Sequence, residues 1–76
     1  MNLSYYLVHN QHHYYPIGEI SFNKLYTDYG WRMLNQIVKQ NKTDELERLS
    51  IRRSDGVILT IEDFLEEIKL YQIREN

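Results

Sequence analysis

Apolar side chains recur at helical spacing over residues 21–40, the longest periodic stretch of this chain. Positions three and four residues apart share one face of an α-helix, and an apolar face of this kind is typical of a helix that packs on a core. Ser21 precedes the pattern, where its side-chain oxygen can accept from an unpaired backbone N–H. The pattern predicts one long amphipathic helix, with a main apolar face made of Phe22, Leu25, Tyr26, Tyr29, Met33 and Ile37.

A second apolar stripe lies on roughly the opposite side of the same predicted helix. It consists of Trp31, Leu34 and Val38, and it begins beside Gly30, which weakens a helix interior by about 1 kcal/mol relative to alanine. A kink or break at Gly30 would merge both stripes into one core. A straight helix would have to bury both sides or offer one of them to a partner. The sequence leaves these alternatives open.

The residues before this helix predict a β-hairpin. Residues 2–8 (NLSYYLV) and 14–20 (YYPIGEI) are rich in aromatic and aliphatic side chains, as strands are. The polar residues 9–13 separate them as a loop centred on Asn10 and Gln11. Pro16 has no N–H to donate to a ladder, so the second strand is expected to lie at an edge or to end near Pro16.

A second hairpin is predicted further along the chain. Residues 41–47 are polar and indicate either a short helical turn capped by Thr43 or a loop. Beyond them, Leu49 and Ile51 alternate with polar residues, a pattern that predicts a half-buried strand. A three-residue turn ending at a left-handed Gly56 would set Ile51 opposite Leu59 and Leu49 opposite residue 61. This register keeps the apolar residues on one face and is preferred to that of a two-residue turn.

A second amphipathic helix follows Thr60, whose hydroxyl is placed to cap it. Asp63, three residues later, completes an approximate capping box. The apolar stripe of this helix is expected at Ile61, Phe64, Leu65, Ile68 and Tyr71, with residues 75–76 loose beyond it. The elements together predict a small single α+β domain over residues 1–76, of order ββαββα. Its sheet would be four-stranded and mainly antiparallel, with two helices packed on one face.

The composition of the chain excludes some kinds of site and makes others less favourable. The chain has 76 residues, no cysteine and a formal net charge of −2, so disulfides and thiolate metal sites are excluded and nonspecific nucleic-acid binding is disfavoured. No basic and apolar leader and no run of about 18 apolar residues is visible, so we expect a cytoplasmic protein without membrane contact. Seven tyrosines exceed what a small core needs, and tyrosine is frequent in binding surfaces.

Catalytic and metal chemistry find little support in the sequence. His9, His12 and His13 form the single candidate metal cluster, but histidines in a hairpin loop are more often solvated, so no metal or other cofactor is predicted. No nucleophile elbow and no glycine-rich phosphate loop is present. A chain of this length also has little room for an enclosed active site. The sequence therefore predicts that the protein is not an enzyme.

Three groups of residues are candidates for binding. Exposed apolar side chains beside an arginine are typical of protein contacts, and spaced carboxylates can face a basic groove or mimic phosphates. A cluster of arginines on a hairpin suits phosphate groups. The predicted partner-binding residues are Trp31, Arg32, Leu34 and Val38 with the acidic helix residues Glu62, Asp63, Glu66 and Glu67, and the nucleic-acid-binding alternative consists of Arg48, Arg52 and Arg53.

The leading hypothesis is a non-catalytic module that binds a larger intracellular protein, one that handles nucleic acid. A homodimer through the Trp31 stripe is a variant of it. In overall character, being small, acidic, cysteine-free and rich in tyrosine, the chain is similar to accessory proteins of phages and mobile elements, which commonly act as inhibitors. The alternative hypothesis is a small nucleic-acid-binding regulator that uses the basic 48–53 hairpin.

Overall fold

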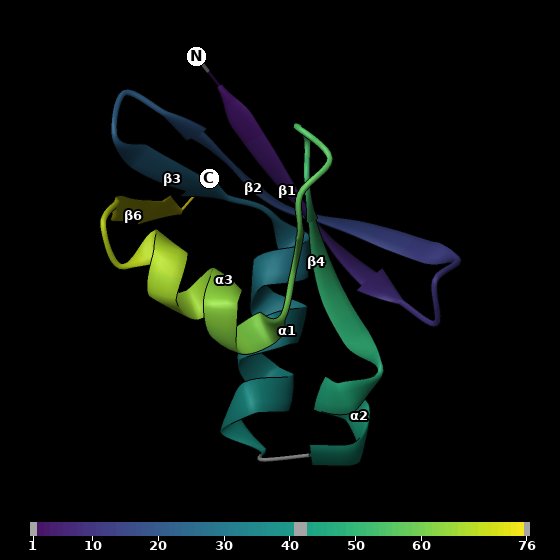
Figure 1. The fold of residues 1–76 in the computed structure, drawn as a ribbon. Coiled ribbons are helices and arrows are strands. Elements are labelled where there is room, and N and C mark those ends of the chain that lie inside the picture. The colour runs from purple at the N-terminus through teal and green to yellow at the C-terminus, as the bar shows by residue number, and fades with distance from the viewer. Residues whose placement is uncertain (1, 41–42, 76) are drawn as a thin grey trace.

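The computed structural model describes residues 2–40 and 43–75 (Figure 1). Within them the chain forms a six-stranded sheet and three helices. In chain order the elements are β1 (Leu3–His9), β2 (His13–Ser21), β3 (Lys24–Thr27), α1 (Tyr29–Lys39), α2 (Thr43–Glu47), β4 (Leu49–Arg53), β5 (Ile58–Leu59), α3 (Ile61–Ile68) and β6 (Gln72–Glu75).

The sheet has the strand order β5-β4-β1-β2-β3-β6. Neighbouring strands are antiparallel, except that β6 runs parallel to β3. The prediction of a small α+β domain is confirmed. The predicted order ββαββα and the four-stranded sheet are wrong, because the structure has two further strands, β3 and β6, and a further helix, α2.

The predicted N-terminal hairpin is confirmed. Asn10 and Gln11 lie in the left-handed region, with φ of 52° and 65°, as a tight turn between twisted antiparallel strands requires. β2 is an interior strand of the sheet, but Pro16 lies in the part of it that pairs with β1 alone, because the pairing with β3 begins at Gly18. The expected edge position therefore holds locally at Pro16. The strand tolerates the proline because its register with β1 shifts between Tyr5 and Tyr6, which pair with Gly18 and Pro16.

The predicted long helix is wrong in its first half. The chain turns at Phe22 and Asn23, whose φ angles are 51° and 61°, and returns as β3. Helix α1 begins only at Tyr29, with the Asp28 side chain accepting from the Tyr29 N–H at 2.8 Å. Phe22, predicted to start the core face, is 92 % exposed at the turn. Ser21 is the last residue of β2 and not a helix cap.

The core-facing side of α1 is also different from the predicted main face. Leu34 is the most buried large side chain of the helix, while Tyr29 is exposed, and Met33 and Ile37 are half-buried. Gly30 does not kink a long helix, because it lies in the first turn of α1. It is buried where the helix meets β2, and a Cβ added to it would lie 2.5 Å from the Pro16 carbonyl oxygen. The absence of a side chain therefore permits this close approach.

The β4–β5 turn and the start of α3 follow their predicted local structure, but the C-terminal residues do not. Ile51 lies opposite Leu59, and Gly56 ends the turn with a φ of +95°. Thr60 caps α3, its hydroxyl accepting from the Asp63 N–H at 3.0 Å. The predicted pairing of Leu49 with residue 61 does not form, because Ile61 is already the first residue of α3.

Helix α3 ends at Ile68, before Tyr71 of the predicted stripe, and Glu75, predicted to be loose, belongs to β6. Asn76 lies outside the described residues.

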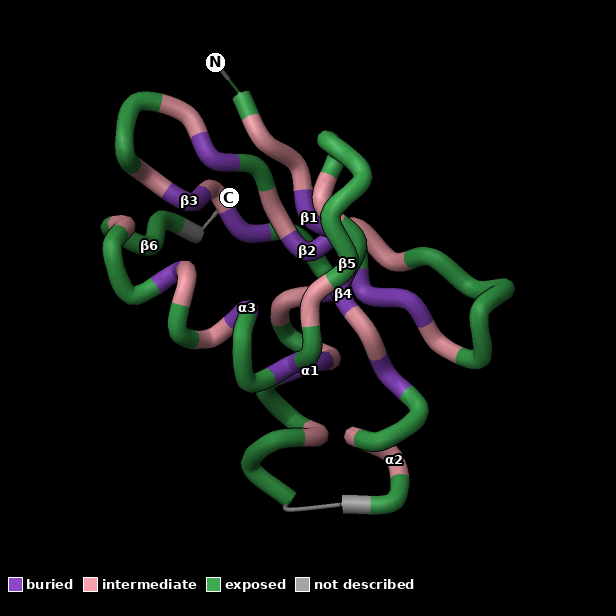
Figure 2. Tube along the Cα trace, viewed as in Figure 1, coloured by how far each residue is buried: buried purple, intermediate pink, exposed green. Residues whose placement is uncertain are grey.

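The core fills the space between one face of the sheet and the helices (Figure 2). Its centre is aromatic. Phe64 is 0 % exposed, and its ring centroid lies 5.2 Å from that of Tyr5 and 6.3 Å from that of Trp31. Helices α1 and α3 both contribute to this cluster, so the prediction that two helices pack on one sheet face describes the arrangement correctly. Within residues 2–40 and 43–75, no helix covers the opposite face of the sheet (Figure 2).

Candidate functional site

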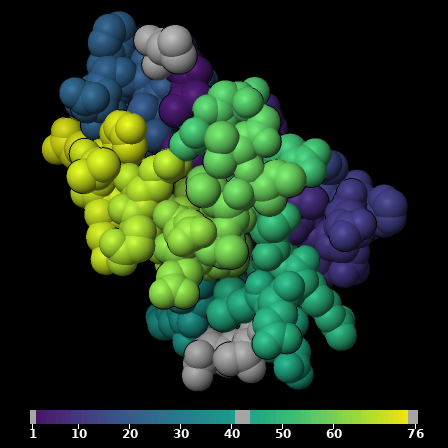
Figure 3. Space-filling view, viewed as in Figure 1, coloured from purple at the N-terminus to yellow at the C-terminus, as the bar shows by residue number. Residues whose placement is uncertain are grey.

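An apolar groove of about 510 Å³ lies where α1, α2, β4 and α3 meet. Its walls come from four segments of the chain, and the surfaces of α2 and α3 beside it are on the face shown in Figure 3. The residues that line it are Val38, Leu46, Glu47, Leu49, Thr60, Ile61, Glu62 and Leu65. We call this set the helical groove.

Each wall of the helical groove follows from local structure. Val38 lies in the last turn of α1 and is 37 % exposed. Leu65 lies one turn after Ile61 on α3, so both side chains point to the same side of that helix. Leu49 and Ile61 are buried in the floor, whereas Leu65 and Leu46 are half-buried. The floor is therefore continuous with the core and partly open to water.

The rim of the helical groove is acidic. Glu47 and Glu62 line it and are exposed, and Asp63 is exposed beside Glu62. Of the four acidic α3 residues predicted to contact a partner, Glu62 and Asp63 are thus exposed at the rim, where a partner could reach them. Glu66 forms an ion pair with Lys69 at 2.8 Å on the surface.

Glu67, the fourth of these residues, is part of the internal structure. One carboxylate oxygen accepts from the buried Tyr5 hydroxyl, and the other accepts from Arg53 Nη1 at 2.7 Å. Arg53 also forms two bonds of 2.8 Å with the Asp55 carboxylate. Burial, and then the bond to Glu67, raise the pKa of Tyr5, so its hydroxyl stays protonated as a donor. These hydrogen bonds connect α3 to β1 and to the β4–β5 turn.

The ion pair of Asp55 predicts a loss of stability in acid. The hydrogen bonds from Arg53 hold the pKa of Asp55 below its ordinary value of 3.8. The contribution of the Asp55 carboxylate to the free energy of unfolding is therefore complete above its pKa in the unfolded chain. It is lost as the pH falls through its lower pKa in the folded protein. We expect the free energy of unfolding to decrease below about pH 4 and to decrease less in Asp55→Asn. Urea unfolding at a series of pH values measures this, and an equal decrease in both proteins would contradict it.

The three arginines of the nucleic-acid alternative do not form one basic surface. Arg52 and Arg53 are consecutive strand residues and therefore point to opposite faces of the sheet. Arg53 is held by Asp55 and Glu67, while Arg52 Nη1 donates to the Tyr14 hydroxyl at 2.9 Å. Arg48 follows α2 and lines a separate cavity with residues of α1 and β1.

The predicted Trp31 stripe is mostly internal. Leu34 is 1 % exposed and cannot contact a partner directly. Trp31 is half-buried, with its ring at 72° to that of Phe64, and Arg32 is exposed beside it. Only Val38 among the apolar members of the stripe reaches the helical groove. The stripe points inward because α1 is shorter than predicted and has a single core-facing side centred on Leu34.

A second surface, which the sequence pattern does not predict, lies on the sheet face that no helix of the described residues covers. Tyr6, Tyr14 and Tyr26 lie there with Arg52 and Ile58, since these residues alternate along their strands with core residues. The surplus of tyrosines indicated a binding surface of this kind. Their meeting on one face depends on the strand order, which the sequence pattern does not contain.

The three histidines lie at the first hairpin turn and its flanking strands. His9 and His13 face each other across the first hairpin with ring centroids 6.5 Å apart. Within residues 2–40 and 43–75, no group of three or more histidine, cysteine or acidic residues could hold a metal ion. In the same part of the chain, no helix is long and apolar enough to cross a membrane.

Comparisons of the chain with models of protein families, with curated proteins and with solved structures found no match.

Proposed function

We propose that the protein is a non-catalytic module that binds a larger protein through the helical groove. The observation that carries this proposal is an apolar groove with an acidic rim. Val38 and Leu65 leave apolar surface partly open to water, and burying such surface drives association. Glu47 and Glu62 border the same opening and favour a positively charged ligand.

The chemistry of the groove indicates an amphipathic basic segment as the partner's contact. A helix that lays its apolar side into a groove is a common mode of recognition, and lysines or arginines on its flanks would face the acidic rim. The volume of about 510 Å³ has room for several apolar side chains. A partner that handles nucleic acid would carry basic segments, in agreement with the expectation from the sequence.

The nucleic-acid alternative has less support. Arg52 and Arg53 point to opposite faces of the sheet, Arg48 lines a different cavity, and Arg53 is neutralised by two carboxylates. The inhibitory role that phage and mobile-element accessory proteins play stays a prediction, and it requires that the bound partner loses activity.

A matched pair of lysine substitutions tests the proposal. Val38→Lys places a charge in the groove, whereas Phe22→Lys places the same charge on a turn outside it, where Phe22 is 92 % exposed. With each protein as bait in extracts of cells that naturally make it, we expect wild type and Phe22→Lys to recover the same partner. Val38→Lys should recover about tenfold less, because an unpaired charge disrupts an apolar contact.

Two outcomes of this capture experiment count against the helical groove. The first is equal recovery of every bound protein by Val38→Lys and Phe22→Lys. The second is recovery of no protein above a bait-free control. Far-UV circular dichroism of both variants verifies that they are folded before the comparison.

A further inference from the structure

The sheet face that no helix of the described residues covers is unusually aromatic for a surface in contact with water. Antiparallel sheets that leave one face open usually present polar residues there. This face instead presents Tyr6, which is 36 % exposed, Tyr14, which is 45 % exposed, and the half-buried Tyr26. Rings displayed on a sheet in this way are surfaces on which proteins stack the unpaired bases of single-stranded nucleic acid.

The strand register sets these rings at successive levels along the sheet. Tyr14 is level with Val8 of β1, two residues after Tyr6. Tyr26 is level with Ser4 of β1, two residues before Tyr6. Strand residues rise about 3.3 Å each, so neighbouring levels lie about 7 Å apart. Successive bases of one extended strand therefore find successive rings to stack on.

Cations lie on both sides of these rings. Arg52 is on β4, while Lys24 and Arg74 are on β3 and β6, so the inner strands β1 and β2 separate them. Arg52 pairs with Tyr6 and Arg74 pairs with Tyr26, which places their side chains on the same face as the rings. Among the side chains that the structure describes, none of these cations forms an ion pair. They are therefore available to the phosphates of a bound strand.

Tyr14 orients Arg52 on this face. The Arg52 guanidinium lies 5.6 Å from the centre of the Tyr14 ring, and its Nη1 donates to the Tyr14 hydroxyl at 2.9 Å. A guanidinium has five N–H donors, so most of them remain for phosphate oxygens. Its plane is also a surface on which a base can stack. The contact with Tyr14 therefore positions the cation and leaves it able to bind a nucleic acid.

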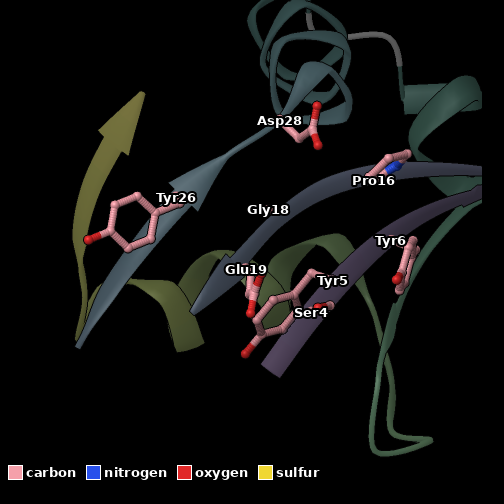
Figure 4. A pocket seen from close by; sticks show the side chains of 8 residues that line it. All are labelled: Ser4, Tyr5, Tyr6, Pro16, Gly18, Glu19, Tyr26 and Asp28. Atoms are coloured by element: carbon pink, nitrogen blue, oxygen red, sulfur yellow. The ribbon is translucent and has the colours of Figure 1, made fainter. Parts of the chain in front are cut away.

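A pocket of about 240 Å³ lies among the rings, over β1, β2 and β3 (Figure 4). Its lining includes Tyr6, Tyr26 and the carboxylates of Glu19 and Asp28, and no lining residue is cationic. Glutamate and aspartate recognise the exocyclic amino group of cytosine, which donates to the carboxylate. Thymine has no such amino group. The pocket therefore favours cytosine over thymine.

We propose that the uncovered sheet face binds single-stranded nucleic acid, with bases stacked on Tyr6, on Tyr26 and on the Arg52–Tyr14 pair. The cations that flank the rings bind the phosphates, and the pocket beside Glu19 accepts a cytosine. A single strand is the occupant because a duplex keeps its bases stacked inside and cannot present them to a sheet.

Charge placement supports this occupant. The chain has a formal net charge of −2, yet three cations gather around the rings, where they attract phosphates locally. The surface is separate from the helical groove, and of the arginines predicted to bind nucleic acid only Arg52 belongs to it.

Fluorescence anisotropy with short labelled oligonucleotides tests the stacking. We expect wild type to bind oligo(dC) more tightly than oligo(dT) of equal length, and both more tightly than a duplex of that length. Tyr6→Ala and Tyr26→Ala should each raise the dissociation constant for oligo(dC) about tenfold, because each removes a ring on which a base stacks. Tyr29→Ala is the control, since this tyrosine is 52 % exposed on α1, away from the uncovered face, and it should bind like wild type.

Two further variants separate the phosphate contacts from the base contacts. Arg74→Gln should weaken the binding of both oligonucleotides to the same extent and reduce its salt dependence, whereas Lys39→Gln, at the end of α1, should do neither. Glu19→Ala should abolish the preference for oligo(dC) over oligo(dT).

Four results would overturn the proposal. They are no binding of either oligonucleotide by wild type at low salt, equal effects of Tyr6→Ala and Tyr29→Ala, equal effects of Arg74→Gln and Lys39→Gln, and an unchanged preference for oligo(dC) in Glu19→Ala. Backbone amide NMR spectra of every variant establish that it is folded, so a loss of binding cannot be assigned to unfolding.

Discussion

Replacing Phe64 by alanine is expected to lower the free energy of unfolding by about 3–5 kcal/mol. The side chain is 0 % exposed and contacts the rings of Tyr5 and Trp31, so its removal leaves a cavity between α3, β1 and α1. The other phenylalanine, Phe22, is 92 % exposed. Phe22→Ala should change the free energy of unfolding by no more than about 0.5 kcal/mol.

Urea unfolding followed by far-UV circular dichroism measures both variants. A loss of about 3–5 kcal/mol would remove most of the stability of a small domain, so Phe64→Leu, with an expected loss of about 1–2 kcal/mol, keeps the comparison measurable. Equal effects at Phe22 and Phe64 would contradict the placement of the two rings. They would agree instead with a helix that starts at residue 21 and buries Phe22.

Gly30→Ala is expected to destabilise the protein by about 1–3 kcal/mol, although alanine is the better helix former by about 1 kcal/mol. The added Cβ would lie 2.5 Å from the Pro16 carbonyl oxygen and 2.9 Å from that of Tyr15. Both atoms belong to the backbone of β2 where it pairs with β1, so they cannot move without disturbing the sheet.

The same unfolding experiment measures the glycine variant. Gln36→Ala, at an exposed position of α1, is the control for helix propensity and should leave stability nearly unchanged. A Gly30→Ala protein more stable than wild type would show that α1 does not approach β2 as closely as the structure places it.

Local signals were sufficient for about half of the fold. The first hairpin, the Gly56 turn and the Thr60 cap were predictable, because each depends on residues within a few positions of one another. Residues 22–27 were not predictable in this way. Over so short a stretch, Leu25 and Tyr26 satisfy a helical pattern, while Leu25 and Thr27 satisfy the alternation of a strand. Pairing with β2 and β6 decides between them, and that information is distant in sequence.

The candidate binding sites, like the fold, could be predicted only in part from the local sequence. Val38 and Glu62 were each predicted as contact residues, but they come from separate helices, and only the fold brings both to the helical groove. Leu34 and Glu67 were also predicted from the sequence as contact residues. They turn inward because α1 packs on the sheet through Leu34, and because Glu67 meets Tyr5 and Arg53. Residue type identified the candidates, and tertiary structure separated the exposed ones from the buried ones.

The helical groove is tested most directly by an NMR titration of the ¹⁵N-labelled protein with a synthetic amphipathic helix of leucine and lysine. We expect the backbone amide shifts of groove residues to change and the changes to weaken in Val38→Lys; the residues concerned are Val38, Leu46, Glu62 and Leu65. Shift changes confined to the uncovered sheet face, or no changes at all, would contradict the assignment of the groove as the protein-binding site.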